Sequence, residues 1–164
     1  MPRKQLSKQL VWFSGKHFVT SRLGLMGYVP LMTSSISSQY PGSDIMVLNF
    51  TNGKKVDVQV KTRTYQKNVN WYVPENVDDM DAIFVFDKIS ADRESIISYV
   101  VPSVYVARES KRQREDYIAN RPNVSDKQPR MIRKDSSIGF SENWGFSRIL
   151  SKMLKRYRFE SISM

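Results

Sequence analysis

The chain has 164 residues, of which 40% are hydrophobic, and it carries a formal net charge of +10 without a single cysteine. That length is sufficient for one soluble domain with its own core, and the lack of cysteine excludes disulfides and cysteine-based zinc sites. No stretch approaches the roughly 20 apolar residues of a membrane span, and no apolar signal core follows the basic N-terminus, so the sequence predicts a cytoplasmic protein that does not enter membranes.

The first predicted element is a helix over residues 7–26, which the Ser7 hydroxyl caps and Gly27 ends. One apolar stripe includes a glycine that would let the helix approach a sheet closely, and it comprises Trp12, Gly15, Val19, Leu23 and Met26. Lys16 is expected on a more polar face. His17 is the only histidine, which leaves little material for a histidine-based metal site or catalytic triad, and we interpret it as a helix-face residue.

The next predicted elements are two strands joined by a tight turn. Residues 44–50 are mostly apolar on both faces, which predicts a strand in the interior of a sheet. The turn at Asn52-Gly53 is of the kind that two-residue hairpins prefer. Residues 54–64 then alternate, with valines on one face. The other face is polar and comprises Asp57, Gln59, Lys61 and Arg63.

Downstream, short apolar runs predict strands at 71–73, 81–86 and 95–101, and helices at 104–119 and 141–157, with a loop over 121–134. The apolar stripe of the last helix predicts a core contact or a dimer interface. Together the elements predict an α/β fold with a mixed central β-sheet of about five strands, flanked by an N-terminal helix and a C-terminal amphipathic helix. We expect a single domain over residues 1–164, with a core at about 7–107 and a basic extension and helix at 108–164.

Positive charge is distributed unevenly along the chain. Residues 103–164 contain 14 Lys and Arg against 7 Asp and Glu, a net +7, whereas residues 1–102 have a net +3. Separated basic patches favour a polyanionic partner, in first place a nucleic acid, over a surface that is merely solvated. The residues expected to contact nucleic acid, with the tyrosine stacking on a base, are Lys16, Arg63, Tyr65, Lys67, Arg148 and Lys152.

Asp44, Gln59 and Lys61 together suit metal-assisted chemistry on a phosphate. The carboxylate of Asp44 and the amide oxygen of Gln59 are ligands that a hard cation such as Mg²⁺ accepts. Lys61 lies two residues after Gln59, roughly 7 Å further along the same face of the strand. Its charge there could position a water molecule or stabilise charge that develops at phosphorus. The alternative interpretation of this pattern is an ordinary, half-exposed surface hairpin.

Around these residues the sequence resembles the restriction-endonuclease-like, or PD-(D/E)xK, nuclease superfamily in its Q-x-K variant. The matching residues are Pro-Gly-Ser-Asp44-Ile45 followed by Val58-Gln59-Val60-Lys61-Thr62. The helix that precedes them and the apolar strands that follow extend the likeness over roughly residues 7–107. The order of elements is similar to that of small Mrr-like and uncharacterised bacterial or phage endonuclease-like proteins.

The resemblance implies a metal-dependent endodeoxyribonuclease that hydrolyses DNA phosphodiester bonds, including structure-selective enzymes of the junction or repair type. It implies Mg²⁺ or Mn²⁺ as the cofactor, held by Asp44, Gln59 and the carbonyl of Val60. Asp44, Gln59 and Lys61 would be the catalytic residues. DNA is expected as the partner, with RNA less favoured, and related nucleases often form homodimers to cut two strands.

Position 16 departs from the family pattern. Many relatives have glutamate there, near the metal, whereas this chain has Lys16 and a neutral Gln59 in place of a second acidic ligand. Asp44 is then the one clear carboxylate, with Asp57 as a second candidate, and fewer anionic ligands mean weaker metal binding. The second hypothesis is therefore a catalytically inactive DNA-binding or interaction module on the same fold, in which an ammonium group replaces the metal.

Overall fold

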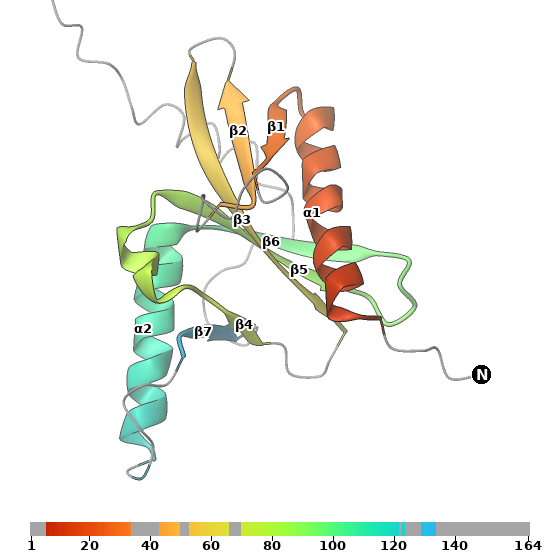
Figure 1. The fold of residues 1–164 in the computed structure, drawn as a ribbon. Helices are drawn as coiled ribbons and strands as arrows, with labels where there is room; N and C mark the ends of the chain where they lie inside the picture. Colours follow the sequence, from red (N-terminus) through yellow and green to blue (C-terminus); the bar gives the residue numbers. More distant parts are fainter. Residues whose placement is uncertain are drawn as a thin grey trace, which may run out of the picture.

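The computed structural model describes residues 6–33, 43–49, 53–65, 70–121, 123 and 129–133, which form an α/β fold around one mixed sheet (Figure 1). The strand order in this sheet is β1-β2-β3-β5-β6. β3 and β5 run parallel, and the other neighbours pair antiparallel. The bounds are α1 Lys8–Leu25, β1 Val29–Met32, β2 Ile45–Asn49, β3 Lys54–Thr64, β5 Ala82–Ile89, β6 Ile96–Pro102 and α2 Ser103–Ala119.

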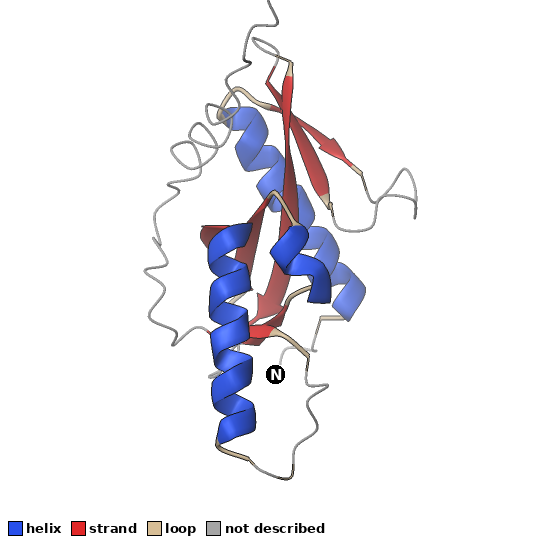
Figure 2. Ribbon diagram, turned by 90° about the vertical axis from the view of Figure 1, so that its left-hand side faces the viewer, coloured by secondary structure: helices blue, strands red, loops and turns tan. Residues whose placement is uncertain are grey.

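Three shorter elements complete the described fold. β4 (Asn70–Tyr72) and β7 (Met131–Arg133) pair in a second, two-stranded sheet, and η1 (Glu75–Asp79) is a 3-10 helix. In Figure 2, α2 and η1 lie in front of the main sheet and α1 lies behind it. The sheet therefore separates two apolar cores, one beneath α1 and the other shared by α2, η1 and the small sheet.

The predicted α/β class and the mixed sheet of five strands are confirmed, but the prediction is wrong about one strand. The strand predicted at 71–73 is β4, which pairs with β7 outside the main sheet. The fifth strand of the main sheet is instead β1, which pairs with β2. β1 contains Pro30, which an edge strand tolerates because one of its sides faces no neighbouring strand. With β1 beside it, β2 is an interior strand, as its two apolar faces predict.

The loop predicted over 121–134 is wrong at β7. Ile132 is fully buried opposite Trp71, and the Trp71 ring lies 5.4 Å from the ring of Phe86 on the main sheet. A strand of three residues contains too little alternation to be recognised from its sequence. Burial of Trp71 and Ile132 against the main sheet fixes this pair instead.

Two of the predicted helices have different outcomes. The helix predicted at 104–119 is confirmed as α2. The helix predicted at 141–157, with Arg148 and Lys152, lies outside the described residues, and so does Lys67. Just before β7, Arg130 is 4% exposed, and its guanidinium binds the carboxylate of Asp78 and a carbonyl of α2. This arginine fastens η1, α2 and β7 together.

α1 begins and ends as predicted. The backbone N–H of Leu10 donates to the hydroxyl of the N-cap Ser7 at 3.3 Å, and Gly27 follows the helix with a φ of 83°, which favours glycine. The prediction of its buried face is partly wrong, because Trp12 is 47% exposed whereas Lys16 is 1% exposed. A hydropathy pattern places lysine outside, and lysine is buried only where the fold supplies a partner for its charge.

β3 presents different chemistry to the two cores. Its valines pack with apolar side chains of α1 in the first core. Its polar side chains lie on the other face, where they line up with residues of the parallel strand β5. The register on that face pairs Gln59 with Phe84, Lys61 with Phe86 and Arg63 with Lys88. The predicted alternation of β3 is therefore confirmed, and its polar face borders the second core.

At Gly15, α1 lies very close to β3. A Cβ atom built there would lie 1.7 Å from the hydroxyl oxygen of Thr62 and 2.8 Å from its Cβ. We expect Gly15→Ala to lower the free energy of unfolding by about 1–3 kcal/mol, because helix or strand must shift. Gly24→Ala on the same helix, where a Cβ meets nothing within 4 Å, should instead raise it by about 0.4–1 kcal/mol. Urea unfolding measures both changes, and equal values for the two variants would contradict the close approach.

Candidate functional site

Asp44 lies just before β2, and its backbone N–H and its carboxylate extend the ladder of hydrogen bonds between β2 and β3. The backbone N–H of Asp44 donates to the carbonyl of Val58 at 3.0 Å. Its Oδ2 accepts hydrogen bonds from the backbone N–H of Val60 at 2.8 Å and from Gln59 Nε2 at 2.9 Å. Asp44 is 8% exposed and Gln59 is 7% exposed. The structure therefore brings two of the predicted catalytic residues together in a buried position.

Lys16 joins this pair from α1. Its Nζ lies 2.5 Å from Asp44 Oδ1, and its side chain is 1% exposed. The same ammonium lies 3.7 Å from the centre of the Trp12 ring, one turn earlier on the helix, where the ring face attracts a cation. Removing two charges from water costs several kcal/mol for each ion. The attraction between the ions offsets this cost only if they are close and further hydrogen bonds satisfy their remaining polar atoms. The two N–H donors on Asp44 Oδ2 meet that requirement.

Lys61 is the third predicted catalytic residue, and it lies within electrostatic reach of the same pair. Burial lowers the pKa of Lys61, the Asp44 carboxylate raises it, and the Lys16 ammonium lowers it again. The cluster of Lys16, Asp44 and Lys61 thus combines two ammonium groups with one carboxylate. Its excess of positive charge suits an anion better than a further cation.

A divalent cation does not fit this cluster as it is folded. Both oxygens of Asp44 are engaged by N–H donors, and the ammonium of Lys16 holds the position beside Oδ1. Gln59 Oε1 is buried without a hydrogen-bond donor among the described residues, so it is open as a ligand, but it is uncharged. In the described part of the chain, no group of three or more His, Asp or Glu side chains could hold a metal. The role predicted for the carbonyl of Val60 stays a prediction.

Beyond Lys61, the polar face of β3 ends in two pairs of a cation and an exposed tyrosine, which we call the cation–tyrosine strip: Arg63, Tyr65, Tyr72 and Lys88. The guanidinium carbon of Arg63 lies 5.6 Å from the Tyr72 ring, and Lys88 Nζ lies 4.5 Å from the Tyr65 ring. Arg63 and Lys88 are neighbours across β3 and β5. The exposed fractions of Tyr65 and Tyr72 are 56% and 51%. Rings placed in this way can stack on nucleic-acid bases while the partly exposed Arg63 meets a phosphate, whereas Lys88 is 7% exposed and lies beneath the Tyr65 ring.

The predicted nucleic-acid contacts that the structure describes are Arg63 and Tyr65, which lie in the strip, and Lys16, which does not. The burial of Lys16 against Asp44 speaks against contact with a phosphate. Sequence reasoning missed Tyr72 and Lys88. Their places depend on the β3–β5 register and on β4 folding back toward Arg63, and neither is contained in a local sequence pattern.

Comparison of the chain with models of protein families, with curated proteins and with solved structures finds no match. The geometry of the site is therefore the basis for assigning a function. Of the two α-helices in the described residues, neither has the length and apolar character that crossing a bilayer requires.

Proposed function

We propose that this chain is a DNA-binding protein on a restriction-endonuclease-like fold, with an internal ammonium group in place of a catalytic metal ion. The observation that carries the proposal is the buried ion pair between Lys16 Nζ and Asp44 Oδ1, at 2.5 Å. Three donors of the protein itself satisfy the Asp44 carboxylate. Asp44 therefore fastens α1 to the β2–β3 hairpin, and it is not free to act as a metal ligand.

The cation–tyrosine strip supports DNA binding. Lys61 and Arg63 are alternate residues on one face of β3, and Tyr65 follows directly after the strand, beside Lys88 of β5. The net charge of +10 adds long-range attraction for a polyanion. Because a tyrosine stacks only on bases that are not already stacked in a duplex, we infer that single strands or junctions are bound in preference to duplex DNA. RNA is the less favoured target.

A Mg²⁺- or Mn²⁺-dependent endonuclease is the second candidate, and two observations favour it. Gln59 Oε1 is buried without a hydrogen-bond donor in the described part of the chain, as an oxygen that binds a cation would be. The lowered pKa of Lys61 suits a group that positions water or stabilises charge at phosphorus. This candidate requires Lys16 to leave Asp44 when DNA binds. If the chain is an endonuclease, a homodimer would serve to cut both strands.

Fluorescence anisotropy with labelled single-stranded, duplex and four-way-junction DNA tests the proposed binding surface. We expect Tyr65→Ala and Tyr72→Ala each to weaken single-strand binding by about 1–3 kcal/mol, because each removes one stacking ring. Tyr105→Ala is the matched control, since that ring is 47% exposed and 5.2 Å from Arg108 but lies on α2, beside the opposite end of β5. An equal loss in all three variants, or none, would contradict a role for the strip.

Incubation of the same DNAs with Mg²⁺, Mn²⁺ or EDTA decides between the two candidates. The proposal expects the wild-type protein to bind DNA, more weakly as salt rises, and to leave it intact under all three conditions. Cutting that needs a metal and disappears in both Asp44→Asn and Lys61→Ala would establish the endonuclease instead. A protein that binds none of these DNAs would remove both candidates.

A further inference from the structure

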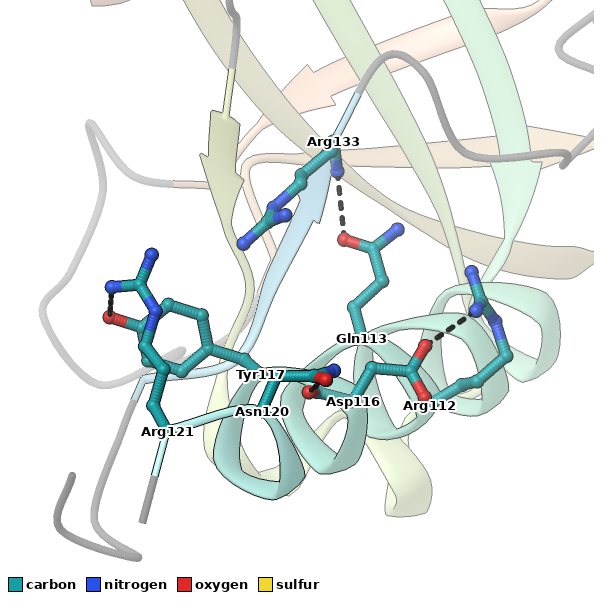
Figure 3. A pocket seen from close by; sticks show the side chains of 7 residues that line it. All are labelled: Arg112, Gln113, Asp116, Tyr117, Asn120, Arg121 and Arg133. Carbon is teal, nitrogen blue, oxygen red and sulfur yellow. Dashed lines mark hydrogen bonds and ion pairs between the residues drawn. The ribbon is translucent and has the colours of Figure 1, made fainter. Parts of the chain in front are cut away.

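A pocket of about 310 Å³ lies between the second half of α2 and β7 (Figure 3). Its lining residues are Arg112, Gln113, Asp116, Tyr117, Asn120, Arg121 and Arg133. None of them belongs to the cluster around Asp44 or to the cation–tyrosine strip. The pocket is therefore a separate site, to which the proposed DNA contacts assign no role.

Positive charge exceeds negative charge in this pocket. Three of its lining residues are arginines, and Asp116 is the one acid among them. The Asp116 carboxylate lies 2.7 Å from Arg112, and Arg112 also binds Glu109 just outside the pocket. Even with Glu109 counted, the three arginines outnumber the two carboxylates among the described residues. Both carboxylates bind Arg112, whereas Arg121 and Arg133 form the other end of the pocket.

Arg121 and Arg133 approach that end from different elements. In Figure 3 the side chain of Arg133 extends from β7 toward the side where Arg121 and Tyr117 lie, whereas Arg112 lies at the far end. Arg121 donates to the Tyr117 hydroxyl at 2.9 Å, with its guanidinium carbon 4.5 Å from the ring centre. The backbone N–H of Arg133 donates to Gln113 Oε1 at 3.1 Å, which fixes β7 against α2. The side chain of Arg121 and the backbone of Arg133 are thus held at the sides of one space.

The chemistry of this space selects the kind of ligand. Two guanidinium groups repel a metal cation, and a lining of arginine, amide and phenol groups offers little to an apolar molecule. A phosphate carries enough charge and oxygen atoms to engage both guanidinium groups in paired hydrogen bonds, which a single carboxylate does less well. We propose that this pocket binds a phosphate group, carried either by a nucleic-acid backbone or by a free phosphate monoester. Its volume is near the lower end of the range for small-ligand sites.

Isothermal titration calorimetry of the full chain with inorganic phosphate and with AMP tests the proposal, against sodium chloride of equal ionic strength. We expect saturable binding that Arg121→Gln and Arg133→Gln each weaken about tenfold. Arg133→Lys should retain part of the affinity, because it keeps the charge and loses the fork. Lys111→Gln removes one charge from an exposed position of α2 outside the pocket and is the control. No saturable binding, or the same loss in Lys111→Gln, would overturn the proposal.

Anisotropy measurements with 5′-phosphorylated and unphosphorylated single strands distinguish the two sources of the phosphate. If the ligand is the nucleic-acid backbone, the double variant of Arg121 and Arg133 should lose affinity for both strands, and inorganic phosphate should compete with both strands. A monoester ligand predicts that the double variant loses AMP binding and keeps its affinity for the unphosphorylated strand. The Tyr65 and Tyr72 variants leave this pocket intact, so failure of the proposed DNA surface and failure of the phosphate site are separately visible.

Discussion

Replacing Lys16 with glutamate is expected to make the stability of the protein depend on a divalent cation. The substitution places a second carboxylate beside Asp44 and the open oxygen of Gln59, in a position shielded from water. Because two buried carboxylates repel each other and the ion pair is lost, the free energy of unfolding in EDTA should fall by about 3–5 kcal/mol. Mg²⁺ or Mn²⁺ prefers oxygen ligands and should restore part of that loss. Urea unfolding with and without the metal measures both effects.

Two control variants separate this coupling from simple damage to the fold. Lys16→Met keeps the apolar stem and removes the charge, so it should lose comparable stability and recover little of it with metal. Lys55→Glu reverses the charge of an exposed lysine on β3 and should change stability by no more than about 0.5 kcal/mol, with or without metal. If Lys16→Glu unfolds at the same urea concentration in EDTA and in Mn²⁺, the ammonium does not occupy a cation position.

The same substitution connects the ion pair to the function of the chain. If the Lys16 ammonium is what keeps a metal away from Asp44, Lys16→Glu should bind Mn²⁺, and calorimetry would detect that binding without any cleavage assay. Lys61 remains in place in this variant. Metal-dependent cutting of DNA by Lys16→Glu, but not by the wild-type chain, would therefore support the proposal that the wild-type protein binds DNA without cleaving it. Cutting by the wild-type chain would remove that proposal.

Local sequence patterns predict most of the β2–β3 hairpin and of α1. The alternation of valines and polar residues predicts the faces of β3, because every second side chain of a strand points the same way. Ser7 and Gly27 similarly predict the two ends of α1, because capping is a local interaction. The register of the hairpin does not follow from its predicted turn. Asn49 pairs with Lys54, which leaves four residues between the strands, whereas a two-residue turn at Asn52-Gly53 would place Asp44 opposite Lys61 instead of beside Gln59.

The burial of Lys16 and the cation–tyrosine strip are not predicted by local sequence patterns, because both depend on contacts between distant segments. Lys16 is buried because Gly15 lets α1 approach β3, and the helix then delivers the ammonium to a carboxylate at the start of β2. The strip forms because the parallel register places Lys88 beside Arg63, and because β4 brings Tyr72 back to the same place. Both arrangements arise from the choice of long-range partner, which periodicity in one segment does not specify.

Asp87 is a further buried carboxyl group that only the sheet register reveals. It is fully buried on β5, on the side of the sheet that α1 covers, between Thr62 of β3 and Ser98 of β6 in the register. The Ser98 hydroxyl donates to Asp87 Oδ1. Asp87 Oδ2 and the Thr62 hydroxyl oxygen have no hydrogen-bond partner among the described residues. Burial raises the pKa of Asp87 to about 7, and the hydrogen bond from Ser98 opposes that rise only in part.

A raised pKa at Asp87 has a definite consequence for the pH dependence of stability. The ordinary value is 3.8, so between about pH 4 and pH 7 the folded protein holds a proton that the unfolded chain has released. The contribution of this group to stability is full below that window and falls by about 1.4 kcal/mol per pH unit across it, to a total loss of about 4 kcal/mol. Above about pH 7 the loss is complete and constant.

Asp87→Asn, which is neutral at every pH, should therefore gain stability relative to the wild-type protein as the pH rises from about 5 to 7, and the gap should be constant at about pH 8. Urea unfolding of both proteins at each of these pH values measures the gap. Ser98→Ala removes the hydrogen bond that lowers the pKa of Asp87, so in that variant the window should move to higher pH. Parallel pH profiles for the wild-type protein and Asp87→Asn would mean that Asp87 is already ionised in the folded protein, which would require a partner charge or water that reaches its carboxylate.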